Sequence, residues 1–131
     1  MAQTPPAPPY HELRPVRQHR WETAADDLVV VMVPKFTHRW LVGWFVPLLR
    51  HREMRVRLDE IGSFVWRECN GDATVGTIAA RVQARFGGNP EDALRRVTRF
   101  FSRLAREQSL AFYPPGVSAP PPVDEDSGKN G

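Results

Sequence analysis

The chain has 131 residues, 13 of them proline, and a formal net charge of +3 from 18 basic and 15 acidic residues. About 100 residues remain to fold between the proline clusters at the two ends, which is enough for one small domain and excludes a large α/β enzyme. A single cysteine, Cys69, excludes a disulfide framework and a multi-cysteine zinc site. The longest apolar stretch, 40–49, is too short to span a membrane, and no secretory signal begins the chain, so we expect a cytoplasmic protein. The proline clusters predict disordered tails over residues 1–13 and 114–131, the second of them acidic.

The first half of the folded region is predicted to form antiparallel strands. Residues 16–22 are a weak candidate and the apolar run 28–33 is a strong one, with a hairpin turn expected between them. Residues 53–58 alternate apolar and charged side chains, which predicts a third strand. We expect this strand to be a sheet edge, because a long segment separates it from its neighbour. Its apolar face should carry Met54, Val56 and Leu58.

The separating segment, residues 34–52, is rich in tryptophan, and its apolar residues recur at helical spacing. A short helix or an irregular turn, kinked at Pro47, is expected there. Its apolar stripe fits a core contact, a dimer contact or an anchor at a membrane surface. The interface candidates are Trp40, Trp44, Phe45 and Leu48.

Three helices are expected next, each with local signals at its ends. The first follows Asp59 over 60–68, the second follows Thr74 and ends before Gly87, and the third begins at Pro90. A short closing strand is predicted over 110–113, and strands followed by helices indicate an α+β fold. The expected buried stripes are Ile61, Phe64, Val65 and Cys69, with Trp66 at the flank; Val75, Ile78, Ala79, Val82 and Phe86; and Leu94, Val97, Phe101 and Leu104.

No group of residues in the sequence is typical of an enzyme. The histidines lack metal-ligand spacing, the paired glycines 87–88 follow a helix rather than a strand, and Cys69 falls on an apolar helix stripe. We therefore expect no catalytic residue, no metal, no cofactor and no enzymatic activity. The third helix instead carries a cluster of arginines, which fits a solvated basic face, an anionic peptide partner or DNA. These arginines are Arg95, Arg96, Arg99, Arg103 and Arg106.

The run LDEIGSFVW over 58–66, followed by CNGDATV over 69–75 and IA at 78–79, resembles the PqqD family. The resemblance implies a winged-helix-like domain over 14–113, with about three strands followed by three helices. It further implies a RiPP recognition element: a peptide-binding chaperone that docks the leader of a ribosomally made precursor peptide as an added strand. The module then presents the precursor to a maturase, often a radical SAM enzyme.

The resemblance also implies where the leader lies, in the space between the third strand and the third helix. The corresponding residues are Glu53, Arg55, Val56 and Arg57 on the strand, and Arg95, Arg96, Val97, Arg99, Phe100 and Arg103 on the helix. Val97 and Phe100 are the expected apolar floor, and the acidic end of the chain could shield the arginines. The 34–52 insertion departs from the family pattern and either covers the strand or builds a homodimer. A DNA-binding winged-helix regulator and a homodimeric interaction module remain the alternatives.

Overall fold

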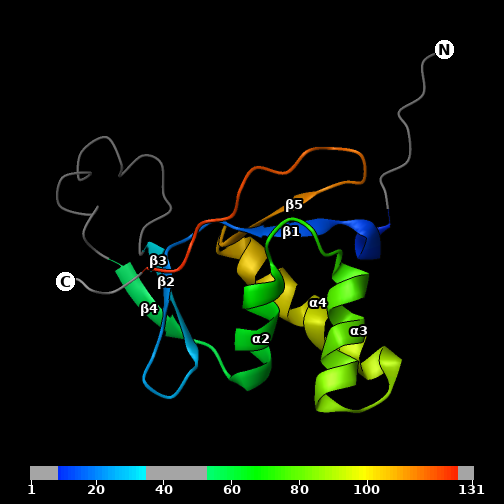
Figure 1. The fold of residues 1–131 in the computed structure, drawn as a ribbon, viewed down its shortest axis with the longest axis horizontal. Coiled ribbons are helices and arrows are strands. Elements are labelled where there is room, and N and C mark those ends of the chain that lie inside the picture. Colours follow the sequence, from blue (N-terminus) through cyan, green and yellow to red (C-terminus); the bar gives the residue numbers. More distant parts are fainter. Residues whose placement is uncertain (1–8, 35–52, 127–131) are drawn as a thin grey trace.

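The computed structural model describes residues 9–34 and 53–126, and it has the predicted α+β architecture (Figure 1). Two antiparallel sheets are combined with three helices, which lie together on one side of the larger sheet. The elements in chain order are the 3-10 helix η1 (Tyr10–Glu12), β1 (Arg14–Arg17), β2 (Trp21–Thr23), β3 (Val29–Pro34), β4 (Glu53–Arg57), α2 (Glu60–Glu68), α3 (Val75–Phe86), α4 (Pro90–Arg106) and β5 (Leu110–Tyr113).

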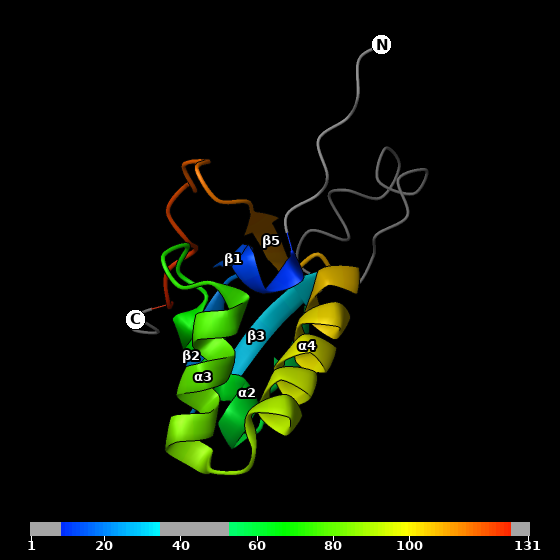
Figure 2. The same ribbon diagram turned by 90° about the vertical axis from the view of Figure 1, so that its right-hand side faces the viewer.

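The larger sheet has the order β2-β3-β4, and all its pairs are antiparallel. The predicted hairpin between its first two strands is confirmed: Ala24 N donates to Leu28 O at 2.8 Å, and Asp27 adopts the left-handed φ of 71° that the tight turn requires. Val29, Val31 and Val33 of β3 face the helices and belong to the core. The central strand β3 therefore packs its inner face against the helices (Figure 2).

The smaller sheet pairs β1 with β5, so the closing strand predicted at the end of the domain is present. The prediction of a single strand over 16–22 is wrong, because the chain leaves β1 after Arg17 and enters the other sheet at Trp21. Arg17 N donates to Cys69 O and Gln18 N donates to Ser109 O, and these bonds turn the chain between the two sheets.

Side-chain caps begin the three helices, as predicted. Asp59 Oδ1 accepts from Gly62 N at 2.7 Å, Thr74 Oγ1 from Thr77 N at 3.1 Å and Asn89 Oδ1 from Asp92 N at 2.8 Å. Each cap satisfies one of the amide groups that a helix start leaves without a partner.

The core lies between the larger sheet and the helices. Trp66 is fully buried in it and makes a T-shaped ring contact with Trp21, and the prediction that it lies at the flank of α2 is wrong. Leu94 is 40% exposed, and the buried position predicted for it is filled by Ala93, one residue earlier on the helix. α4 is thus rotated slightly from the predicted stripe, and its buried residues are Ala93, Val97, Phe101 and Leu104.

The segment 114–126, part of the expected C-terminal tail, lies against β1 and β2. Val123 N donates to Arg17 O at 3.2 Å, and Asp126 N donates to Trp21 O at 2.6 Å. Trp21 Nε1 also donates to Val123 O at 3.1 Å. An extended, proline-rich segment can follow a strand in this way as long as a few of its residues supply N–H donors. No described helix has the length and apolar character needed to cross a membrane.

Candidate functional site

The free side of β4 is the first feature of the site. β4 pairs with β3 alone, and Leu58 N donates to Val29 O at 2.9 Å. Bonded and non-bonded pairs alternate in an antiparallel ladder, so the N–H and C=O groups of Arg55 and Arg57 point away from β3. Within residues 9–34 and 53–126, no other strand pairs with that side.

The opposite side of the same sheet is covered. Glu125 forms a parallel bridge with Trp21 of β2, and Asp126 N donates to the Trp21 carbonyl. Asp126 also pairs with Arg20 at 3.4 Å. The acidic end of the described chain therefore lies along β2, and the prediction that it shields the arginines of α4 is not supported. Among the described elements of this sheet, β4 is left as the open edge.

On the sheet face away from the helices, Arg55 of β4 pairs with Glu22 of β2. The pair spans β3, and the Arg55 guanidinium reaches to 3.8 Å from Met32 Sδ. Val30 and Met32 are buried, although they point away from the helical layer. The ion pair therefore helps to cover an apolar strip on the outer face of the sheet.

Arg57 makes the equivalent contact at the turn, where it pairs with Asp26. Arg55 and Arg57 stand two residues apart and so lie on the same face. Their side chains are 59% and 57% exposed, respectively, which leaves both guanidinium groups accessible to a ligand. Glu22 and Asp26 were not predicted as site residues, because their pairing depends on the strand register.

The inner face of β4 is apolar and incompletely covered. Met54 is 44% exposed and Val56 is half-buried, and both lie opposite core residues of β3. Phe100 of α4 is half-buried against the same core and lies close to Gly62. Val97 is 1% exposed and belongs to the core, as the predicted stripe of the third helix requires, and its role as apolar floor of a peptide site stays a prediction.

α4 carries the second group of predicted site residues. Arg95 pairs with Asp92 at 2.8 Å and Arg103 with Glu107 at 3.8 Å. Among the described residues, Arg96, Arg99 and Arg106 make no ion pair and are exposed. Arg96 and Arg103 stand four and three residues from Phe100 and so share its side of the helix. A hollow of about 220 Å³ brings together Asp92, Arg95, Arg96 and Arg99.

The described side chains offer little to catalysis. Cys69 is fully buried, its Sγ donates to Val65 O at 3.2 Å, and burial raises the pKa of the thiol. No group of three or more His, Cys, Asp and Glu side chains within residues 9–34 and 53–126 could hold a metal ion. The buried thiol agrees with the structural role expected from the sequence.

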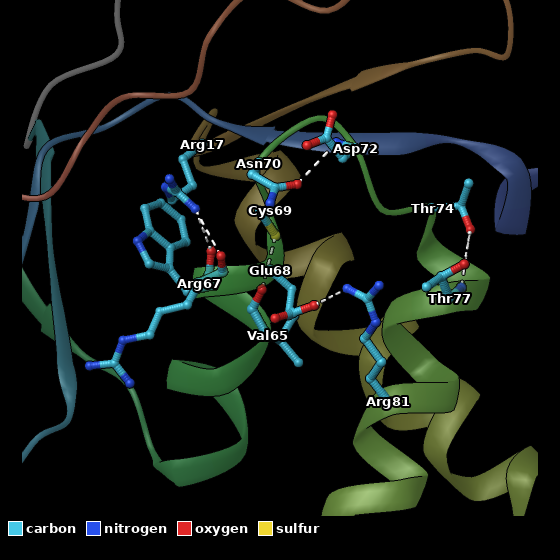
Figure 3. A network of polar contacts seen from close by, with 11 residues as sticks. Arg17, Val65, Arg67, Glu68, Cys69, Asn70, Asp72, Thr74, Thr77 and Arg81 are labelled. Atoms are coloured by element: carbon cyan, nitrogen blue, oxygen red, sulfur yellow. Dashed lines mark hydrogen bonds and ion pairs between the residues drawn. The ribbon is translucent and has the colours of Figure 1, made fainter.

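Arg17 is a structural residue that the sequence analysis did not identify. Its guanidinium donates to the carbonyls of Trp66 and Arg67 at the end of α2, at 3.3 and 3.1 Å (Figure 3). Its Nε donates to Val123 O at 3.2 Å. The guanidinium also lies over the ring of Trp21, at 5.2 Å from the ring centroid. Burial lowers the pKa of Arg17, and the carbonyls at the helix end stabilise its charge.

The remaining predicted residues are Glu53 and the interface candidates of the 34–52 segment. Glu53 lies opposite Pro34 at the start of the β3–β4 ladder. The interface candidates Trp40, Trp44, Phe45 and Leu48 lie outside the described residues, so the homodimer remains a prediction.

Fold and site together define a small α+β domain that has an open strand edge among its described elements and an arginine-rich helix. Residues 48–110 match the family model described as coenzyme PQQ synthesis protein D (PqqD), the family that the sequence motifs over 58–79 resemble. No curated protein and no solved structure matches the chain.

Proposed function

We propose that this protein is a non-catalytic peptide-binding chaperone of the PqqD type. It docks the leader of a ribosomally made precursor peptide as an added strand along β4. It then presents the precursor to a modifying enzyme of the radical SAM class in the cytoplasm. The match of residues 48–110 to a family of cofactor-synthesis proteins supports the general role, and the open edge of β4 supports the docking position.

The single observation that carries the proposal is the difference between the two sides of the larger sheet. The β2 side is taken by the chain's own residues 123–126, while no strand within residues 9–34 and 53–126 pairs with the outer side of β4. An unpaired edge accepts a further strand, because the ladder supplies main-chain hydrogen bonds whatever the sequence of the peptide.

Neighbouring side chains add to this ladder. The outward N–H and C=O groups of Arg55 and Arg57 provide four hydrogen-bonding positions, each of which contributes about 0.5–1.5 kcal/mol net. Met54 and Val56 offer apolar surface on the inner side of the docked strand. Arg96 and Arg103, on the Phe100 side of α4, provide a positive border that favours acidic leaders over basic ones.

A proline substitution in β4 tests the docking position. Proline at position 55 removes an N–H that points away from β3, so it deletes a ligand bond and leaves the β3–β4 ladder bonds in place. We expect Arg55→Pro to weaken binding of the leader peptide encoded beside this protein at least ten-fold, as measured by fluorescence anisotropy. Arg55→Ala keeps the N–H and should weaken binding only about two- to five-fold.

Circular dichroism and the melting temperature check that the Arg55→Pro variant is folded. Equal affinity of the wild-type, Arg55→Pro and Arg55→Ala proteins would reject docking on β4. The presentation step is tested separately. A radical SAM enzyme encoded nearby should modify the full precursor faster with the wild-type protein present, and Arg55→Pro should remove that gain. A gain that survives in Arg55→Pro would contradict the proposed link between docking and presentation.

A further inference from the structure

The geometry of β4 points to a specific chemical pattern in the peptide. We infer that the docked strand carries two acidic residues separated by one apolar residue, which Arg55 and Arg57 bind. In the free protein, these arginines are paired with Glu22 and Asp26. This inference rests on the proposed docking of a peptide along β4.

The first step is the register of side chains. In both parallel and antiparallel sheets, directly opposed residues of adjacent strands place their side chains on the same face. Peptide residues opposite Arg55 and Arg57 therefore lie on the outer face, and the residue between them lies opposite Val56 on the inner face. The spacing of two is the same for either direction of the peptide.

The second step is the chemistry of each face. The outer face presents the exposed guanidinium groups of Arg55 and Arg57, which match carboxylates two residues apart. The inner face presents Met54 and Val56, which match an apolar side chain and offer no partner to a charge. An acid–apolar–acid segment satisfies both faces at once.

The third step is the state of the arginines without a peptide. Arg55 pairs with Glu22 across β3, and Arg57 pairs with Asp26 in the β2–β3 turn. The arginine side chains are more than half exposed, and ion pairs of this kind contribute little to stability. A peptide carboxylate beside the strand can therefore replace Glu22 or Asp26. The internal acids therefore act as competitors, which the carboxylates of a docked peptide must displace.

Competition of this kind predicts opposite effects for the two partners of each pair. Arg55→Gln should weaken binding of an acidic peptide, whereas Glu22→Gln should strengthen it by about two- to five-fold, because the guanidinium is released. A purely structural role of the ion pair would make the two substitutions act in the same direction. Glu68→Gln is the matched control, since it breaks the exposed Glu68–Arg81 pair between α2 and α3 and leaves β4 unchanged.

The experiment uses the full chain and synthetic peptides of about eight residues, a typical strand length. In the first peptide Asp and Val alternate, in the second the same residues are grouped into an acidic half and an apolar half, and in the third Lys replaces Asp. We expect the alternating acidic peptide to bind about ten-fold more tightly than the grouped one, and the Lys peptide to bind most weakly. Glu22→Gln should increase affinity for the alternating acidic peptide alone, and Glu68→Gln should change nothing.

The outcomes separate this inference from the proposed function. Equal binding of the three peptides, with protection of the β4 amides from hydrogen exchange, would overturn the acid–apolar–acid pattern and leave docking intact. Reduced binding by Glu22→Gln would overturn the competitor role. Absence of binding by every peptide and by the natural leader would overturn the proposed function and this inference together.

Discussion

The ring of Phe100 in α4 lies so close to Gly62 in α2 that a Cβ added at Gly62 would stand 3.0 Å from Phe100 Cε1. The same Cβ would meet Leu58 Cβ at 3.4 Å, just past the end of β4. Absence of a side chain at position 62 thus lets the Phe100 side of α4 pack closely against the first turn of α2. Phe100 is therefore held against the core close to Leu58, the residue that follows β4.

Gly62→Ala tests the importance of that contact. Alanine favours the helix by about 1 kcal/mol over glycine, but crowding against Phe100 costs about 1–3 kcal/mol. We expect a net loss in the free energy of unfolding, measured by urea denaturation, that Phe100→Leu reduces in the double variant. A coupling of at least about 0.5 kcal/mol between the two positions is expected. Strictly additive effects would show that Phe100 does not constrain position 62.

Arg17→Met should destabilise the fold. The change removes three donors to buried or half-buried carbonyls and the positive charge at the end of α2, and we expect a loss of about 2–4 kcal/mol. Arg17→Lys keeps the charge but lacks the planar guanidinium, and its free energy of unfolding should lie between those of the wild-type protein and Arg17→Met. Arg106→Met, on the exposed side of α4, is the control and should change the free energy of unfolding by less than about 0.5 kcal/mol. Equal stability of all four proteins would contradict the structural role of Arg17.

Removal of residues 123–131 should expose the second edge of the larger sheet. The deletion eliminates the bonds that Val123 and Asp126 make with Arg17 and Trp21. We expect a lower melting temperature and concentration-dependent association in light scattering, because two open edges then remain. Deletion of residues 127–131 alone keeps all of these contacts and should behave as the full chain. A monomer of unchanged stability after the longer deletion would show that the segment does not protect β2.

The arginines of α4 allow a direct comparison of peptide and DNA as partners. Arg96, Arg99 and Arg106 make no ion pair among the described residues, and a DNA-binding helix would use such side chains on phosphates. We expect the natural leader peptide to bind more tightly than a short DNA duplex at physiological salt. The matching variant carries three substitutions, Arg96→Gln, Arg99→Gln and Arg106→Gln. Tighter binding of the duplex, with a steep salt dependence that this variant removes, would favour the DNA-binding alternative.

The sequence predicted those parts of the fold that depend on local signals. Each helix cap involves residues within one segment of four, and the β2–β3 hairpin depends on a short turn. The separation of β1 from β2 could not be read in this way, because β1 depends on Cys69 and on β5 near the other end of the chain. The path of the C-terminal segment could not be predicted for the same reason, since its partners Arg17 and Trp21 lie more than 100 residues away in the sequence.

The candidate site shows the same limit. Resemblance to the PqqD family pointed to β4 and α4, and the alternation of residues 53–58 separated the charged from the apolar face. The exposure of Leu94 differs from prediction because the exact rotation of α4 depends on packing against neighbouring elements. The roles of Glu22 and Asp26 depend on the strand register and on the turn, neither of which the periodicity of β4 specifies.

Hydrogen exchange at two backbone amides tests the central claim most directly. The N–H groups of Arg55 and Arg57 point away from β3, so they should exchange rapidly in the free protein. With saturating leader peptide, we predict that both amides become at least ten-fold slower to exchange. Unchanged exchange at Arg55 and Arg57 under the same conditions would contradict docking of the peptide on β4.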